Sequence, residues 1–371
     1  MHPLDYKGCI FNALREVECM NVVEQYNLTL QIEVLKEQSA ETLARLCNLV
    51  EESGTSDCIE VLKAYSHIVN TELYLATSIH ELDILKSDMV KLENTIKESL
   101  AQASHDISDI KETGDVQAIE SYSSEDFEKA LERTIDFLTF NKNISSTPRA
   151  VILGGQSGAG KTTIHRVKML ESKGNYIVID GDTYRAQHPY FRELQEKYGV
   201  NSVDYTKMFA GKMVEAVIDK LSSLKYNLII EGTLRSAAVP INTATLLKSK
   251  GYTVDFCLIA TKPELSYLTT QLRYLEMMIV DPLQARATPK DHHDGIVKSL
   301  VANITELEQS GVFESIQVYK RDLEQVYNSK LCTKSVGTVV DKILFGPWTS
   351  DEYALLEVSK SQEQELREKL P

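Results

Sequence analysis

The residues best suited to chemistry form the segment 155–162, which reads GQSGAGKT and fits the phosphate-binding pattern G-x-x-x-x-G-K-[ST]. An apolar run at 150–153 precedes it and predicts a buried strand, and 163–167 contains no helix breaker and predicts a helix start. The glycines allow backbone N–H groups to turn inward around phosphate oxygens, and the positive end of the helix strengthens that field. Lys161 is expected to reach the β- and γ-phosphates, and the Thr162 hydroxyl to hold Mg²⁺. These flanks make a chance glycine-rich turn the weaker interpretation.

Carboxylates follow two further strand candidates. Asp180 and Asp182 end the run at 176–180, and Glu231 ends the run at 227–231. Ligands of an open parallel sheet bind beyond the carboxyl ends of its strands, so these groups are expected beside the phosphate loop. There they can serve Mg²⁺ and a substrate hydroxyl. Asp180 could instead only shape a turn, and Asp182 could instead cap a short helix.

Two arginines stand apart from ordinary surface charge. Arg273 lies in a predicted helix at 263–278, and Arg286 lies in QARATP (284–289), which is typical of a loop or lid before another helix. Phosphoryl transfer requires cations that meet the charge of the migrating group, which either arginine could supply. Both could equally be solvated surface side chains.

The elements that must position these groups alternate between strand and helix. Five short, nearly continuous apolar runs predict buried parallel strands at 150–154, 176–180, 227–231, 254–260 and 315–319. Helices are predicted between them, notably at 203–222 and 263–278. The pattern predicts a three-layer α/β domain with a parallel sheet, followed by a helical piece at 330–371.

The first third of the chain has a different pattern. Apolar residues recur at helical spacing around 28–50, 61–73 and 82–96, which predicts a small antiparallel helical bundle. Residues 101–122 are polar and acidic and indicate a linker, after which Ser123 is expected to cap a helix. We therefore divide the chain into a helical domain with its linker (1–115), a P-loop domain (116–350) and a helical tail (351–371).

Composition limits the class of protein. The chain has 371 residues, of which 43% are hydrophobic and 25% charged, as in globular proteins. It shows no apolar run long enough for a membrane span, no opening signal segment and no C-x-x-C pair among six cysteines, so a cytoplasmic setting is expected. Of the net charge of −14, residues 1–115 carry −12, from 9 basic and 21 acidic side chains. This acidity argues against nucleic-acid binding; it could suit a basic partner surface or simply be a solvated face.

Several separated motifs resemble the zeta toxin family. They are GGQSGAGKTT (154–163), DGD (180–182) with QHP (187–189), IEGT (230–233) with Arg235, and QARATP (284–289), and together they cover roughly 122–350. The resemblance implies an ATP- and Mg²⁺-dependent kinase that phosphorylates a sugar hydroxyl of UDP-N-acetylglucosamine and so blocks peptidoglycan synthesis.

The resemblance also implies roles for individual residues. Asp182 is the expected general base, and Lys161, Arg273 and Arg286 stabilise the phosphates during transfer. The expected ATP-binding residues are Gly155, Gln156, Ser157, Gly158, Ala159, Gly160, Lys161, Thr162 and Thr163, with Thr162 on the metal. The expected contacts to the nucleotide sugar are Asp182, Glu215, Glu231, Thr233 and Arg235.

Two segments of the first third, 23–33 and 65–75, resemble the helical part of epsilon-type antitoxins, which block the nucleotide site of such toxins. The chain is thus expected to be a toxin–antitoxin fusion whose own helices inhibit the kinase, in cis or by exchange within a homodimer. Two alternatives remain open from the residues alone. One is a P-loop phosphotransferase of another small hydroxyl compound, such as an antibiotic. The other is a non-catalytic regulator that senses nucleotide.

Overall fold

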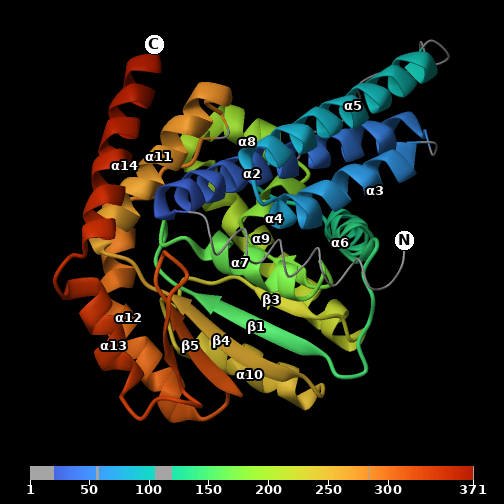
Figure 1. Cartoon of the computed structure of the whole chain (residues 1–371). Helices are drawn as coiled ribbons and strands as arrows, with labels where there is room; N and C mark the ends of the chain where they lie inside the picture. Colours follow the sequence, from blue (N-terminus) through green and yellow to red (C-terminus); the bar gives the residue numbers. More distant parts are fainter. Residues whose placement is uncertain (1–20, 56–57, 105–118, 284, 371) are drawn as a thin grey trace, which may run out of the picture.

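The computed structural model of the chain describes residues 21–55, 58–104, 119–283 and 285–370 (Figure 1). Its centre is a six-stranded sheet with the strand order β2-β3-β1-β4-β5-β6. The strands are β1 (Arg149–Gly154), β2 (Ile177–Ile179), β3 (Leu228–Ile230), β4 (Thr253–Ile259), β5 (Ser315–Tyr319) and β6 (Gln325–Asn328). The first five pair in parallel, which confirms the predicted sheet, and β6 joins β5 in antiparallel fashion. Strand β6 was not predicted, because QVYN is short and polar and has no continuous apolar run.

Buried apolar side chains set the register of the central strands. Ile152 of β1 lies level with Ile230 of β3 and Phe256 of β4, and all three are buried. Because β1 to β4 run in parallel, their carboxyl ends meet at one edge of the sheet. This edge holds the segments that were predicted to carry chemistry.

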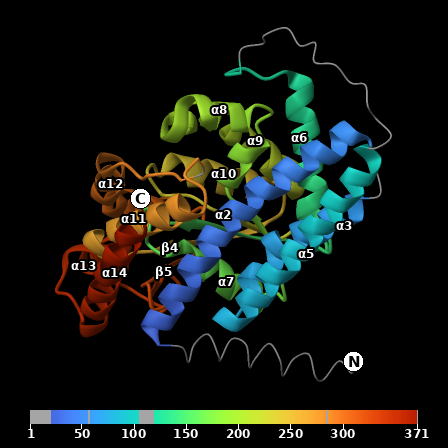
Figure 2. The same ribbon diagram turned by 90° about the horizontal axis from the view of Figure 1, so that it is seen from above.

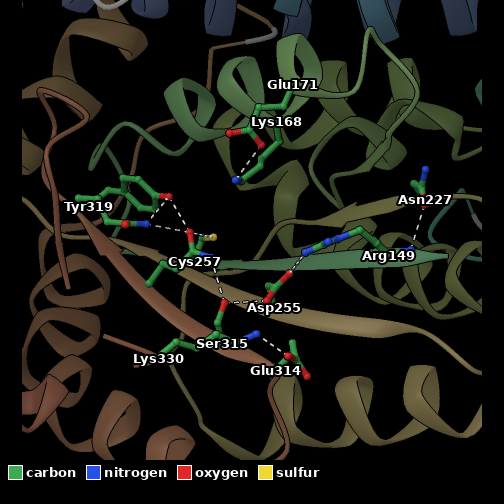
Figure 3. Close-up of polar contacts among 12 residues, drawn as sticks. Arg149, Lys168, Glu171, Asn227, Asp255, Cys257, Glu314, Ser315, Tyr319 and Lys330 are labelled. Atoms are coloured by element: carbon green, nitrogen blue, oxygen red, sulfur yellow. Dashed lines mark hydrogen bonds and ion pairs between the residues drawn. The ribbon is translucent and has the colours of Figure 1, made fainter. Parts of the chain in front are cut away.

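A polar network ties the strands together within the sheet (Figure 3). The carboxylate of Asp255, which is 5% exposed, accepts from Arg149 at 2.8 Å and from the Ser315 hydroxyl at 2.7 Å. These residues come from β4, β1 and β5, so one satisfied buried acid connects three neighbouring strands. The network starts from Arg149 at the first residue of β1, away from the phosphate loop at the other end of that strand, and we assign it a structural role.

Helices cover both faces of the sheet, as predicted (Figure 1). On one face, α7 (Lys161–Glu171) packs Ile164 and Met169 against Val151 and Leu153 of β1. The other face holds the largest core, to which these helices contribute: α6 (Ser124–Thr139), α9 (Ser202–Ser223), α10 (Ala238–Ser249), α12 (Lys290–Ser310) and α13 (Val336–Phe345). Ser123 caps α6 in a capping box with Asp126, as expected. The remaining helical elements of this region are 3₁₀ helix η3 (Thr183–Gln187), α8 (Phe191–Tyr198), 3₁₀ helix η4 (Gly199–Asn201), α11 (Pro263–Val280) and α14 (Ser350–Lys369).

The first third folds as the predicted helical bundle, with one difference. The first and third helices are α2 (Val22–Ser53) and α5 (Ile79–Ser104), which pack around a common apolar core. The second predicted helix is broken into α3 (Ile59–His67), the π-helical turn η2 (Ile68–Glu72) and α4 (Leu73–Leu75). Apolar periodicity does not distinguish an inserted π turn from continuous α-helix. Of the predicted linker, residues 105–118 lie outside the described residues.

Helix α2 crosses the sheet edge at which the carboxyl ends of the parallel strands meet. Seen from above in Figure 2, it runs from the neighbourhood of α14 at its start to that of α3 and α6 at its end. It contacts α7, α11, α14 and η3. The predicted helical tail forms helix α14, which packs along α11 and contacts the first turns of α2.

Candidate functional site

The phosphate loop connects β1 to α7 with the backbone geometry that its sequence predicts. Gly158 has φ of 73°, and a Cβ there would lie 2.0 Å from the Ser266 carbonyl oxygen of α11, so only glycine fits. Gln156 is fully buried, and its Nε2 donates to the Thr261 carbonyl at 2.5 Å and to the Ser266 hydroxyl at 3.3 Å. Its side chain therefore anchors the loop to the β4–α11 connection.

Lys161 begins α7 and is almost completely buried. Its Nζ lies 3.6 Å from Oε1 of Glu231, which follows β3, while the other oxygen of Glu231 lies 3.3 Å from Nε2 of His165. Burial and the neighbouring Asp180 raise the pKa of Glu231, although Lys161 acts against them. Burial lowers the pKa of His165 to about 3, which keeps the imidazole neutral. The sequence analysis did not select His165, because it is one polar side chain on a helix rather than part of a motif.

Asp180 and Asp182 both lie at the carboxyl end of β2. Oδ1 of Asp180 accepts from the backbone N–H of Asp182 at 3.0 Å, so Asp180 does shape the turn, but its other oxygen pairs with Lys36. Asp182 precedes η3 and makes no side-chain cap to it. Its Oδ1 instead lies 3.0 Å from Nε of Arg185 and 3.5 Å from NH1 of Arg286.

The electrostatics of Asp182 favour its charged form. Partial burial works to raise the pKa of this carboxyl, but Arg286 and Arg185 outweigh burial and hold the pKa well below its usual range. Asp182 is thus ionised at neutral pH, with about half of its side chain exposed (51%). It can accept a hydrogen bond from a hydroxyl that approaches along the sheet edge.

The two selected arginines converge on one carboxylate from α2. Glu37 lies 2.8 Å from NH2 of Arg286 and 3.4 Å from NH1 of Arg273. Its side chain is 8% exposed, whereas the arginines retain 22% and 23%. Neither arginine is a free surface residue, because each forms an ion pair with Glu37.

Lys36, the residue before Glu37, pairs with a carboxylate at the same edge of the sheet. Nζ of Lys36 donates to Oδ2 of Asp180 at 2.6 Å, with side chains that are 7% and 14% exposed. Burial alone would lower the pKa of Lys36, but Asp180, together with Tyr74 and Glu231, outweighs burial and raises it. Further along α2 toward its start, the Thr29 hydroxyl lies 3.4 Å from that of Thr163 in the first turn of α7. One helix thus contacts both the phosphate-binding and the acid-carrying parts of the edge.

The other predicted substrate residues lie around a separate hollow. Glu231, Thr233 and Arg235 line a cavity of about 260 Å³, to which Phe256 of β4 also contributes. Arg235 is exposed and Thr233 partly exposed. Glu215 is exposed on α9 next to Val214, whose side chain lies against Gly181. Glu215 therefore lies near the Asp180–Asp182 turn but outside the group of side chains that α2 contacts directly.

No described residues form a built metal cage. Within the parts of the chain that the structure describes, no three His, Cys, Asp or Glu side chains gather as metal ligands. The described cysteines, Cys47, Cys58, Cys257 and Cys332, form no disulfide. Among the described helices, none combines the length and the apolar character needed to cross a membrane.

Comparisons with known proteins agree with the arrangement. Residues 134–331 match the family described as Zeta toxin. The chain is a member of the zeta toxin family. Residues 24–99 match Bacterial epsilon antitoxin, so the chain joins an epsilon antitoxin domain to a zeta toxin kinase domain.

The similar zeta toxins match a part of the chain. Toxin PezT of Streptococcus pneumoniae is 55% identical over 251 residues, which are 68% of this chain and 99% of that protein. Toxin zeta of Streptococcus agalactiae is 41% identical over 211 residues, which are 57% of this chain and 74% of that toxin. A solved chain of the PezAT chromosomal toxin–antitoxin system of S. pneumoniae has 52% identity and a TM-score of 0.64, and covers 67% of this chain and 100% of its own.

Proposed function

We propose that this zeta toxin–epsilon antitoxin fusion is an ATP-dependent kinase of UDP-N-acetylglucosamine that its own helix α2 holds inactive. The observation that carries the proposal is the pairing of Lys36 and Glu37 with the groups that phosphoryl transfer would use. Asp180 is neutralised by Lys36, and Arg273 and Arg286 are both engaged by Glu37. A helix that matches the antitoxin family thus pairs with three residues of the catalytic edge.

In the proposed reaction, each selected residue has one task. The phosphate loop binds the triphosphate through backbone N–H groups, and Lys161 neutralises the β- and γ-phosphates. A sugar hydroxyl oxygen forms a bond to the γ-phosphorus, the bond from that phosphorus to the β–γ bridging oxygen breaks, and ADP leaves. Asp182 accepts the hydroxyl proton, which its ionised carboxylate permits. Arg273 and Arg286 stabilise the charge on the migrating group.

The donor set suits Mg²⁺ supplied together with the nucleotide. The Thr162 hydroxyl, Asp180 and Glu231 offer oxygen atoms, the ligands that this ion prefers, and Mg²⁺ usually takes its other ligands from phosphates and water. Bound there, the ion would neutralise charge on the β- and γ-phosphates. Thr162 at the first turn of α7 is the residue proposed to hold it.

The acceptor would approach from the β2–β3 side. The hollow beside Glu231, Thr233 and Arg235 lies beyond the carboxyl end of β3, next to the strand that carries Asp182. Arg235 supplies a cation for a diphosphate, and Glu215 with Glu231 supplies acceptors for sugar hydroxyls. We propose these four residues as contacts of the nucleotide sugar. Residues 1–115, 116–350 and 351–371 remain our proposed division of the chain.

In this scheme, α2 inhibits the kinase because its side chains pair with residues of the site, and not because they repel ATP. The Glu37 carboxylate takes the place that phosphate oxygens would take between two arginines, and Thr29 covers the first turn of α7. Because α2 is part of the same chain, its effective concentration is on the order of millimolar, so even a modest intrinsic affinity keeps the site closed. Relief requires that α2 leave the edge.

The test measures ADP release by the full chain with ATP, Mg²⁺ and UDP-N-acetylglucosamine. We compare the wild type with a Lys36→Ala/Glu37→Ala variant, and use the same double variant with Asp182→Asn as the blank. We expect slow ADP release by the wild type, fast release by the double variant and no release by the blank. A double variant that binds ATP but phosphorylates only other small hydroxyl compounds would contradict the substrate. One that binds ATP and transfers no phosphate to any acceptor would favour the nucleotide-sensor alternative.

A further inference from the structure

We propose that the base of the nucleotide binds between the carboxyl ends of β4 and β5, stacked on the guanidinium of Arg321, in the place that the Tyr26 ring fills. This inference rests on the proposed function, in which the phosphate loop binds a nucleoside triphosphate. It adds a base-binding residue and a wall of the site that the motifs do not contain.

Arg321 is fixed directly beside the phosphate loop. It lies in the connection after β5, and its NH1 donates to the Gly158 carbonyl at 2.9 Å. Its Cγ lies 3.7 Å from the point where a Cβ on Gly160 would stand. The sheet order places β4 and β5 on one side of β1, and the acid-carrying strands β3 and β2 on the other. A nucleotide whose phosphates occupy the loop and whose acceptor lies on the β2–β3 side therefore extends its base toward Arg321.

An aromatic ring from the inhibitory helix already lies on this arginine. The guanidinium carbon of Arg321 is 4.5 Å from the centroid of the Tyr26 ring. Tyr26 is 4% exposed, and its hydroxyl lies 3.4 Å from the Thr269 hydroxyl and 3.1 Å from that of Ser359. Within the described residues Arg321 forms no ion pair, although Glu33 of α2 acts on it electrostatically, so the stack with Tyr26 is its main contact besides the loop carbonyl. Withdrawal of α2 would also remove Glu33 and leave a planar cation, which is a suitable platform for a flat heterocycle.

The walls around Tyr26 suit a base equally well. Leu265 of α11 and Leu355 of α14 are buried in the same apolar cluster as Tyr26. Only about 20 Å³ of free space remains between the β4 and β5 ends and these helices, with Val22 of α2 on its border. Withdrawal of the first turns of α2 would leave a slot with a cation on one wall, Leu265 and Leu355 on others, and Asp351 and Glu352 of α14 at its border. Helix α14, outside the matched family region, then becomes part of the nucleotide site.

The experiment uses the full chain and two ligands, ATP and inorganic tripolyphosphate, titrated by calorimetry in the presence of Mg²⁺. Tyr26→Ala removes the ring, and Tyr26→Phe is the matched control that keeps it. We expect Tyr26→Ala to bind ATP at least about tenfold more tightly than the wild type, and Tyr26→Phe to bind it within about twofold of the wild type. Thermal unfolding of each variant checks that it is folded.

The second arm places Arg321→Ala or Arg321→Lys in the Tyr26→Ala chain. We expect both changes to lower ATP affinity about tenfold, because alanine carries no charge and the lysine ammonium group is not planar. Tripolyphosphate affinity is expected to stay within about twofold. The proposal is overturned if Tyr26→Ala binds ATP no better than the wild type, if the Arg321 variants bind ATP as Tyr26→Ala does, or if both ligands weaken equally. Lys161→Ala in the same Tyr26→Ala chain tests the proposed function separately. If that change weakens the binding of neither ligand, the phosphate loop is not the nucleotide site, and the proposed function itself is wrong.

Discussion

The two halves of the interface between the antitoxin and toxin domains are built on opposite electrostatic principles. In the α2 half, charges are matched: Lys36 meets Asp180, and Glu37 meets Arg273 and Arg286. In the half formed by η2 and α4, cations of the toxin domain are buried without an ion pair within the described residues, although Glu81 acts on Arg166 electrostatically. Arg166 is fully buried and donates to the Ala76 carbonyl at 2.6 Å, and its Nε and NH1 have no hydrogen-bond partner within the described residues.

Lys142 repeats the second pattern. Its Nζ donates to the Thr71 hydroxyl at 2.7 Å and to the Gly174 carbonyl, and burial lowers its pKa to about 7. A buried charge without a counter-charge destabilises the docked state, whereas a matched pair loses most when one partner is removed. We therefore expect the α2 half to contribute most to the specificity of the contact and to the proposed inhibition, and the η2–α4 half to be its weaker part.

The largest effect is expected from Glu37→Ala. It leaves Arg273 and Arg286 largely buried without their shared carboxylate, which costs the docked state about 3 kcal/mol or more. We expect the rate of ADP release by the full chain to rise on the order of 100-fold. Glu41→Ala is the matched control one turn along α2, since Glu41 meets the half-exposed Arg192 at 3.4 Å and is expected to change the rate less than about fivefold. Equal effects of the two changes would refute the special role of the α2 pairing.

Lys36→Met should act in the same direction with a smaller effect. Methionine keeps the length and apolar stem but leaves Asp180 buried with no cation, at a cost of about 2–3 kcal/mol to docking. The measurement is hydrogen exchange of α2 amides in the full chain, with Lys36→Arg as the control that retains the charge. Unchanged α2 protection in Lys36→Met would show that this pair does not hold the helix.

Acid should loosen the η2–α4 half before the α2 half. His165 packs edge-on against Tyr74 of α4, and burial lowers its pKa to about 3. The docked state therefore loses stability as the pH falls below about 6.5, because an exposed imidazole gains a proton there and the buried one does not. Burial of Lys142 likewise makes the docked state lose stability as the pH falls from about 10.5 to about 7. Asp180 has a lowered pKa because Lys36 outweighs its burial, so its contribution is lost only below about pH 4.

Between pH 8 and pH 5.5 we therefore expect protection of residues 68–76 to fall by up to about 100-fold after correction for intrinsic exchange, with about tenfold from each of Lys142 and His165, while residues 25–40 change little. His165→Asn should remove the tenfold part that His165 contributes. A parallel loss in both segments would mean that the two halves open as one unit.

The smallest effect, with reversed sign, is expected from Arg166→Met. Replacement of a buried cation with unsatisfied donors by an apolar side chain of similar length should stabilise docking by about 1 kcal/mol, offset in part by the lost bond to the Ala76 carbonyl. The readout is the midpoint of thermal unfolding, expected to rise by about 2–4 °C. A clear decrease would show that Arg166 strengthens the contact as it stands.

The sequence by itself determined the parts whose information is local. The spacing of glycines and Lys161 predicted the phosphate loop, the apolar runs predicted five parallel strands, and the 3–4 spacing predicted the helical first third. The meeting of Asp180, Asp182 and Glu231 at one edge also followed, because parallel strands end together. The π turn η2 and the polar strand β6 were missed, since neither leaves a clear periodic pattern.

Only the tertiary structure decided which residues of the helical domain face the site. Periodicity shows that α2 is a helix with an apolar stripe, but Lys36 and Glu37 lie beside that stripe and look like ordinary surface charges in the sequence. Their partners stand more than 140 residues away, as Lys36 and Asp180 do, and no local rule relates the two. The same holds for Tyr26 and Arg321, which are brought together by the packing of α2 against α11 and α14. Long-range pairing depends on how whole elements dock, and that is set by the complete apolar surfaces of the domains rather than by any single segment.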